Sequence, residues 1–122
     1  FDRLHKALEA VSDKLILPVP AQNSTPSWFG FLITCKEGTS KNTVVQYCED
    51  HGVQTRMLFA GNITKQPVFD EMRKSGKGYR VIGDLSVTDS IMNNTFWIGV
   101  YPGMTDEMID YMAKTIIEAV NL

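Results

Sequence analysis

The sequence has few of the features that mark membrane, secreted or nucleic-acid-binding proteins. No apolar run approaches the roughly 20 residues that a helix needs to span a bilayer, and the sequence contains no signal-peptide pattern. The net charge of −2 at pH 7 offers no basic face to a phosphate backbone. We therefore expect a cytoplasmic protein that binds neither membrane nor nucleic acid.

Cysteine and histidine are also scarce. Cys35, Cys48, His5 and His51 are the only residues of these types, and their spacing does not make a zinc site. We expect the two cysteines to be small buried side chains in a reducing compartment, with a disulfide or a metal pair as the alternative. A glycine-rich phosphate loop and a GxSxG motif are absent. The sequence therefore contains no recognisable set of catalytic or metal-binding residues.

The composition is that of an ordinary globular domain. Of 122 residues, 43% are hydrophobic and 21% are charged, which suits one domain with one modest core. The chain begins FDRLHKALEA, with no methionine and no helix cap before Phe1, and apolar residues recur at helical spacing through Leu15. This pattern predicts a helix entered midway, so we expect a piece of a longer protein.

The order of elements predicts an α+β fold. We expect a helix over 1–14, an extended linker over 15–27, and a small α/β domain over 28–122. Within that domain, apolar runs predict strands at 28–36, 54–59 and 95–101, and helices follow the cap residues Ser40 and Thr105. A strand–helix–strand crossover runs parallel, so the third strand fits antiparallel between the first two. The result is a small three-stranded sheet with helices packed on one face.

The connection between the second and third strands is unusually long. It covers residues 60–94 and contains two short predicted helices, at 68–74 and 87–93. Connections of this length in a compact domain are usually functional or disordered. We therefore look for a binding site where this connection begins.

A cation, a turn and an amide occur together at that point. Arg56 precedes Gly61 and Asn62, and a guanidinium suits a carboxylate or phosphate. Aromatic residues lie nearby in sequence, and of these we expect Phe96 and Trp97 to pack in the core. The pattern favours a sugar-phosphate or carboxylate ligand.

Three segments resemble a known family: PSWFGFLITCKEG, GVQTRMLFAGNITKQPVF and YRVIGDLSVTDSIMNNTFWIGVYPGMTDEMIDYM. They are similar to the C-terminal small domain of sugar 3-dehydrases within the DegT/DnrJ/EryC1/StrS sugar aminotransferase family, which has fold type I of the pyridoxal phosphate (PLP) enzymes. The resemblance covers nearly the whole chain. The pattern TRxLFAGNxTxQPxF and the block from Gly83 to Met104 are typical of the dehydrase branch.

The resemblance implies a function for a longer parent protein. Such a parent would use pyridoxamine phosphate (PMP) to remove the C3 hydroxyl of CDP-4-keto-6-deoxy-D-glucose, on the route to 3,6-dideoxyhexoses of lipopolysaccharide O-antigen. It would carry an iron–sulfur cluster, form a homodimer, and take electrons from an NAD(P)H-dependent iron–sulfur flavin reductase. The large PLP-binding domain is absent from this chain, so we expect this chain alone to bind no cofactor and to be non-catalytic.

The resemblance also suggests which residues face the substrate. We expect Arg56 to reach toward the nucleotide-sugar phosphates or the hexose, beside Phe59. Gly61 would let the backbone approach the ligand, Asn62 would bond to sugar hydroxyls, and Gln66 is a weaker candidate. No catalytic or metal-binding residue is expected. The alternatives are the small domain of a PLP-dependent nucleotide-sugar aminotransferase and a non-catalytic binding module.

Overall fold

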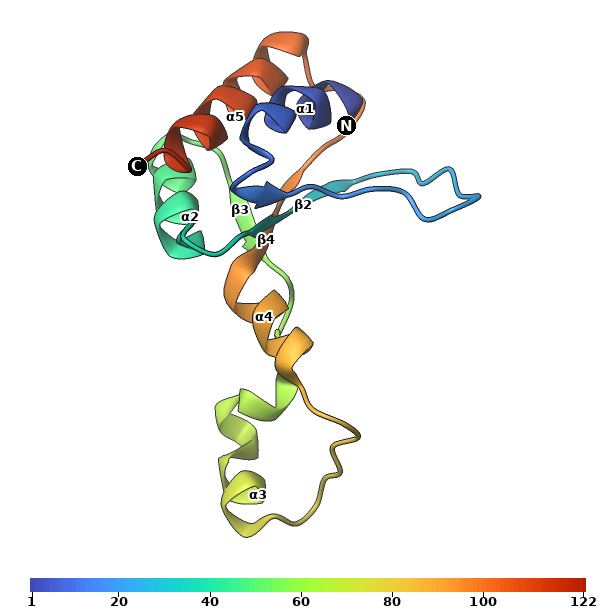
Figure 1. Cartoon of the computed structure of the whole chain (residues 1–122), viewed down its shortest axis with the longest axis vertical. Coiled ribbons are helices and arrows are strands. Elements are labelled where there is room, and N and C mark those ends of the chain that lie inside the picture. Colours follow the sequence, from blue (N-terminus) through green and yellow to red (C-terminus); the bar gives the residue numbers. More distant parts are fainter.

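A four-stranded antiparallel sheet carries the fold, and helices cover one of its faces (Figure 1). This computed structural model describes all residues from 1 to 122. The strands are β1 (Leu15–Ile16), β2 (Gly30–Cys35), β3 (Thr55–Met57) and β4 (Thr95–Gly99). The helices are α1 (Asp2–Leu8), α2 (Lys41–Asp50), α3 (Asp70–Ser75), α4 (Ser86–Asn94) and α5 (Asp106–Ala119), with short 3-10 turns at Glu9–Val11, Ile63–Lys65 and Pro67–Phe69.

The strand order is β1-β2-β4-β3, and every neighbouring pair is antiparallel. The predicted arrangement is therefore confirmed: β4 lies between β2 and β3, which run parallel to each other on either side of it. The prediction of three strands was short by one. The two-residue strand β1 pairs with β2 through Leu15↔Cys35 and Ile16↔Thr34. Two residues are too few to show an alternating pattern, and prolines follow soon after.

The N-terminal segment belongs to the same core as the rest of the chain. Helix α1 is shorter than the predicted 1–14, and its Leu4 and Leu8 are fully buried beside α5. Because β1 joins the sheet, the extended part of the predicted 15–27 linker begins only at Leu17. The connection from there to β2 projects from the body as an arm (Figure 1).

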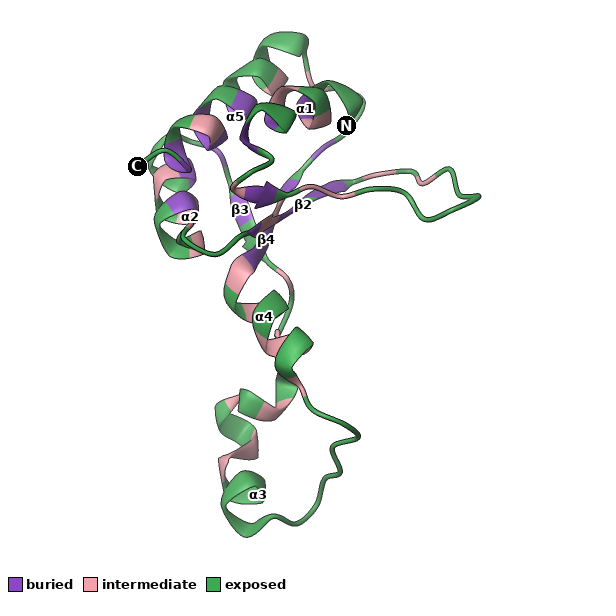
Figure 2. Cartoon of the chain, viewed as in Figure 1, coloured by how far each residue is buried: buried purple, intermediate pink, exposed green.

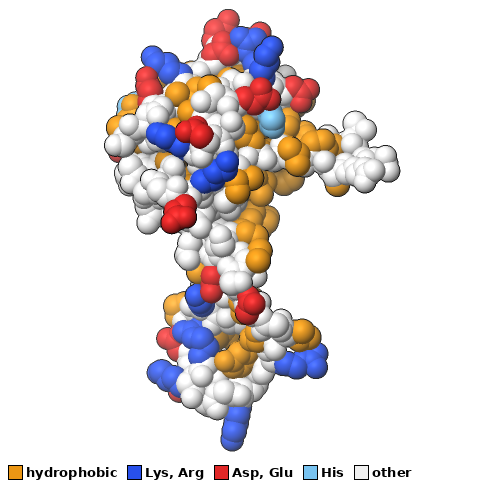
Figure 3. Space-filling view, viewed as in Figure 1, with side chains coloured by type: hydrophobic (Ala, Val, Ile, Leu, Met, Phe, Trp, Pro, Cys, Tyr) orange, Lys and Arg blue, Asp and Glu red, His pale blue; other side chains and the backbone are white.

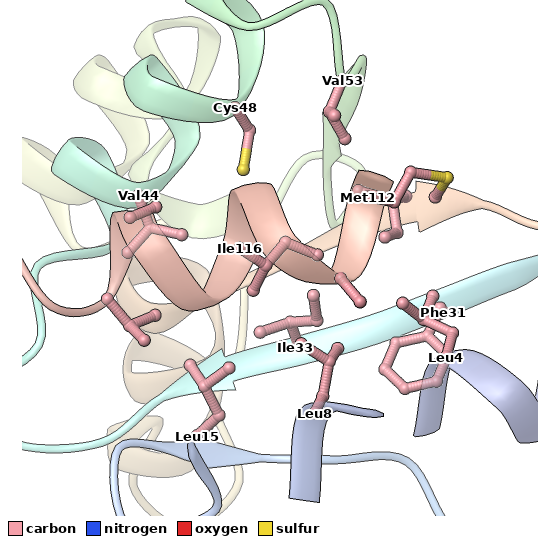
Figure 4. Close-up of a cluster of buried hydrophobic side chains, with 14 of the residues drawn as sticks. Leu4, Leu8, Leu15, Phe31, Ile33, Val44, Cys48, Val53, Met112 and Ile116 are labelled. Carbon is pink, nitrogen blue, oxygen red and sulfur yellow. The ribbon is translucent and has the colours of Figure 1, made fainter. Parts of the chain in front are cut away.

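The core lies between the sheet and helices α1, α2 and α5. Alternation along β2 points Phe31, Ile33 and Cys35 toward the helices, into the core cluster that also contains Ile116 of α5; Figure 4 shows Ile33 beside Ile116. Cys35 and Cys48 are both buried, as predicted, and burial raises the pKa of each thiol to about 11.

Polar caps fix where the main helices begin. The Ser40 side chain accepts from the backbone N–H of Thr43 at the start of α2, and Thr105 accepts from Met108 at the start of α5. Both residues are the predicted caps. No helix of the chain is long and apolar enough to cross a bilayer.

The chain between β3 and β4 forms a second, smaller lobe that extends away from the sheet. We call residues 62–85 the distal lobe; α4 returns the chain from it to the sheet (Figure 1). The predicted helices at 68–74 and 87–93 appear here as the turn Pro67–Phe69 with α3, and as α4. Every residue from 63 to 94 is exposed or half-buried (Figure 2). The distal lobe thus has no apolar core, and polar contacts hold its shape.

Candidate functional site

The face of the sheet opposite the helices is open and carries a row of three side chains. In the strand register Leu32 lies opposite Trp97, and Trp97 lies opposite Arg56. Residues directly opposite each other in antiparallel strands share a face. Their strand neighbours Phe31, Phe96 and Thr55 are buried on the helix side. The row therefore presents a leucine, an indole and a guanidinium side by side.

Arg56 is exposed, and its guanidinium is held in place by its own strand. Its Nη1 donates to the Thr55 carbonyl oxygen at 2.9 Å. Gln54, with its amide oxygen turned toward the guanidinium, accepts from Arg56 at 2.9 and 3.1 Å. These contacts leave the Nε edge of the guanidinium free for a ligand.

Glu49 at the end of α2 locks the start of β3. Its Oε1 accepts from both the backbone N–H and the hydroxyl of Thr55, each at 2.6 Å. These hydrogen bonds, with a smaller contribution from the charge of Arg56, hold the pKa of the Glu49 carboxyl below its ordinary value. The strand that carries Arg56 is thus fixed to the body by a charged hydrogen-bond acceptor.

A strained turn follows the strand. Phe59 has a φ of +49°, which is uncommon for a residue with a side chain, and the residue is 84% exposed. Exposed aromatic rings held in unfavourable backbone conformations tend to occur at functional positions. Phe59 is one of the predicted site residues, and the structure places it at the rim of the open face.

Gly61 is required at the next position for two reasons. Its φ is +62°, and a Cβ built there would collide with the Met92 side chain of α4. Its backbone therefore approaches Met92 closely. Gly61 lets α4 pack against the turn that starts the distal lobe.

Asn62 lies inside the junction between the sheet and the distal lobe, with only 2% of its surface exposed. Its Oδ1 accepts from the backbone N–H and hydroxyl of Thr64, and its Nδ2 donates to Asp89 at 2.7 Å. Lys65 pairs with the other oxygen of Asp89 at 2.9 Å. The hydrogen bond from Asn62, followed by that from Lys65, lowers the pKa of the Asp89 carboxyl. The amide of Asn62 thus clamps the distal lobe to α4.

Gln66 contributes to the same junction. Its Nε2 donates to the Ala60 carbonyl oxygen at 2.7 Å, and its backbone carbonyl oxygen accepts from Arg73 Nη1 at 3.2 Å. From the other side, Lys41 at the start of α2 donates to the Met92 carbonyl oxygen at 2.7 Å. These contacts tie the turn, the lobe and α4 to the body.

An apolar hollow lies beside the row on the open face. It has a volume of about 170 Å³ and its walls are mainly aromatic: Trp28, Phe29, Leu32, Leu58, Phe59 and Trp97. Phe29 meets Trp97 edge to face, with ring centroids 5.8 Å apart, and Gly30 leaves room for the indole ring. Figure 3 shows hydrophobic side chains gathered at the base of the arm and along the stalk that leads from the sheet to the lobe. Arg56 and this hollow together offer an anion contact beside flat apolar surfaces.

The structure divides the five predicted site residues into two groups. Arg56 and Phe59 lie at the open face, whereas Gly61, Asn62 and Gln66 build the junction behind it. The prediction that Trp97 packs in the core together with Phe96 is wrong. Phe96 is fully buried, but Trp97 points to the opposite face and is only half-buried. Strict alternation along TFWIG separates the two residues.

The residues of this chain do not by themselves form a PLP or iron–sulfur site. Lys41 and Lys65 already have partners within the chain, at Met92 and Asp89. Lys77 is exposed in the loop after α3. No group of three or more His, Cys, Asp or Glu side chains comes together to hold a metal, and the only two cysteines are buried in the core.

Comparisons with known proteins agree with the resemblance read from the motifs. The family model described as the DegT/DnrJ/EryC1/StrS aminotransferase family matches residues 1–117. The lipopolysaccharide biosynthesis protein RfbH of Salmonella typhimurium is 44% identical over 97% of the chain, which covers 26% of that protein. The dTDP-4-dehydro-2,6-dideoxy-D-glucose 3-dehydratase of Saccharopolyspora spinosa is 42% identical over 97% of the chain, which covers 25% of that protein.

A solved structure shares the fold at low sequence identity. GDP-4-keto-6-deoxy-D-mannose-3-dehydratase from E. coli, with bound hydrated PLP, superposes with a TM-score of 0.76. It is 18% identical, and the match covers 94% of this chain and 28% of that chain. The chain thus spans about a quarter of the length of the curated relatives it matches. With a family model matched from residue 1 to residue 117, the chain belongs to the DegT/DnrJ/EryC1/StrS aminotransferase family.

Proposed function

We propose that this chain is the C-terminal part of a PMP-dependent nucleotide-sugar 3-dehydrase. The parent would remove the C3 hydroxyl of CDP-4-keto-6-deoxy-D-glucose during the synthesis of 3,6-dideoxyhexoses for lipopolysaccharide O-antigen. The observation that carries the proposal is the row of Leu32, Trp97 and Arg56 on an open sheet face, in a chain whose relatives include a protein named as a sugar 3-dehydratase.

The residues of the open face have distinct roles in this proposal. The guanidinium of Arg56 donates to a phosphate or to an oxygen of the hexose, because its fixed fork suits planar or multidentate acceptors. Phe59, Trp97 and Phe29 provide flat apolar surfaces that exclude water from the sugar ring. Gly61, Asn62 and Gln66 act as positioning residues that fix the turn carrying Phe59.

The cofactor and electron-transfer centres belong to the remainder of the parent. We assign PMP or PLP binding and the iron–sulfur cluster to that remainder, since the side chains of this chain do not fit either group. We further propose a cytoplasmic homodimer that takes electrons from an NAD(P)H-dependent iron–sulfur flavin reductase. Helix α1 would then be the end of an inter-domain helix, packed on the C-terminal small domain that the rest of the chain forms.

A PLP-dependent nucleotide-sugar aminotransferase is the second candidate, because the matching family is named for aminotransferases. The two functions differ in how the parent holds its cofactor. The full-length protein should be incubated with PLP, reduced with borohydride, digested and analysed by mass spectrometry. A cofactor that binds but leaves no label on lysine supports the dehydrase. A pyridoxyl-lysine peptide would instead identify an aminotransferase and refute the dehydrase assignment.

Substrate turnover provides the second test. The full-length protein, supplied with CDP-4-keto-6-deoxy-D-glucose, PMP and a chemical or enzymatic reductant, should give a product lacking the C3 oxygen by mass spectrometry. Retention of that oxygen, with an amino group gained from glutamate, would again favour the aminotransferase. A protein that binds the sugar without changing it would favour a non-catalytic binding module.

A further inference from the structure

A second hollow lies within the distal lobe, and it shares no lining residue with the hollow on the open sheet face. Its volume is about 220 Å³, and its lining residues are Ile63, Thr64, Phe69, Arg73, Tyr79 and Arg80. It therefore combines two aromatic rings with two guanidinium groups. None of these residues is among the five that sequence analysis placed in the substrate site.

The charge of the distal lobe is opposite to that of the whole chain. Residues 62–85 contain five lysines and arginines against three acidic residues, whereas the chain as a whole carries a net charge of −2; Figure 3 shows the lysine and arginine side chains at several places on the lobe. Three of the five cations have acidic partners: Lys65 with Asp89, Arg73 with Asp70, and Lys74 with Glu71. The two that remain, Lys77 and Arg80, make no side-chain hydrogen bond or ion pair.

The two arginines of the hollow differ in their freedom to bind a ligand. Arg73 donates to the carbonyl oxygens of Thr64 and Gln66 and pairs with Asp70, so it serves as a fixed wall. Arg80 is exposed and unpartnered at the same hollow. An unpaired guanidinium beside aromatic rings is suited to a phosphate attached to a flat, stacking group.

The size of the hollow limits what it can hold. Pockets that enclose a whole small-molecule ligand usually measure about 300–1,000 Å³. At about 220 Å³, this one suits one end of a larger molecule. A base can stack on Phe69 or Tyr79, because every base presents a flat π-face to an aromatic ring.

From these observations we infer that the distal lobe binds the nucleoside diphosphate end of the substrate, with the base against Phe69 or Tyr79 and a phosphate at Arg80. The inference rests on the proposed function, because a nucleotide sugar has one end for the open sheet face and another for the lobe. The lobe has no apolar core of its own, so bound ligand also adds contacts that order it.

Calorimetric titration of the full-length protein tests the inference, with CDP, dTDP, GDP and inorganic pyrophosphate as separate probes. At least one nucleoside diphosphate should bind about tenfold or more tightly than pyrophosphate. Arg80→Ala should weaken that binding about tenfold or more, as expected for loss of a charged hydrogen bond, and Arg80→Lys should restore part of it. Lys114→Ala is the matched control, since Lys114 is an exposed cation on α5 paired with Glu118; it should bind as the wild type does.

Each contrary outcome has a clear meaning. Wild-type affinity in Arg80→Ala, or no binding of any nucleoside diphosphate, would overturn the inference. Pyrophosphate binding as tightly as the nucleotides would overturn the assignment of the base to Phe69 or Tyr79. Turnover of the nucleotide sugar is measured separately. If the protein dehydrates its substrate but Arg80→Ala binds nucleoside diphosphates as tightly as the wild type, the proposed function stands and only the site in the distal lobe is refuted.

Discussion

Replacing Gly61 with alanine should loosen the distal lobe and leave the sheet intact. The substitution destabilises the lobe in two ways, through backbone strain and through a steric clash. A residue with a side chain at φ +62° carries strain of about 1–2 kcal/mol, and the new Cβ meets the side chain of Met92. Forcing extra volume into a packed contact typically costs about 1–3 kcal/mol. The opening free energy of the lobe should therefore fall by about 2–5 kcal/mol.

Amide hydrogen exchange measured by mass spectrometry resolves this effect by segment. Peptides covering residues 62–94 should exchange between about thirtyfold and several thousandfold faster, since each 1.4 kcal/mol corresponds to about a factor of ten. Peptides from β2 and β4 should keep their protection, because their partners lie in the body. Gly38→Ala is the matched control: Gly38 has a φ of +87° but nothing within 4 Å of its added Cβ. Exchange around that turn should rise only about tenfold.

A double-mutant cycle isolates the contact with Met92. In the Gly61→Ala background, Met92→Ala removes the obstructing side chain and should recover the packing part of the loss, about 1–3 kcal/mol. If Gly61→Ala were no worse than Gly38→Ala, or if Met92→Ala recovered nothing, close approach of α4 would not be the reason for glycine at this position.

Four further outcomes are expected. In the full-length protein, Arg56→Ala should lower kcat/KM about tenfold to a hundredfold through loss of a charged hydrogen bond, with an unchanged melting temperature; unchanged kinetics would remove Arg56 from the site. Phe59→Gly should relieve the strain at φ +49° and stabilise the turn by about 1 kcal/mol in denaturant titrations while weakening sugar binding, and a loss of stability would contradict this account. Folding lowers the pKa of the Glu49 carboxyl, so this group adds to the free energy of unfolding above the ordinary glutamate pKa near 4.5, and the addition is lost as the pH falls through the lower folded value. Glu49→Gln should therefore make the free energy of unfolding fall less steeply with decreasing pH. An unchanged slope would mean that other carboxyls cause the fall. The 122-residue chain on its own should dimerise or aggregate in sedimentation experiments, since Phe29 and Phe59 are 74% and 84% exposed, and a monodisperse monomer would count against an apolar docking face.

The body of the fold could be predicted because its elements carry strong local patterns. The caps Ser40 and Thr105, the apolar stripe of α5 and the dense apolar run of β2 each specify one structure without reference to the rest. The position of β4 between β2 and β3 followed from the handedness and direction of crossovers. The strand β1 could not be predicted, since its two residues are too few to show an alternating pattern.

The candidate site was predicted only in part, and the reason is its dependence on tertiary contacts. Arg56 and Phe59 could be located because a strand end and a long connection mark them. An asparagine that hydrogen-bonds a ligand and one that, like Asn62, donates to the half-buried Asp89 cannot be told apart in sequence. The hollow around Arg80 draws its walls from both ends of the lobe, and no spacing rule brings Ile63 and Tyr79 together.

The position of the distal lobe has a consequence for how specificity can change within this architecture. Strands β3 and β4 are hydrogen-bonded neighbours, so everything between Met57 and Thr95 is an insertion in a hairpin whose two ends lie side by side. The entropy of closing such an insertion rises by only about 0.6 kcal/mol for each doubling of its length. Homologous proteins can therefore differ in the length and sequence of this segment without loss of the fold, because the hydrophobic core of the body contains no residue between Met57 and Thr95.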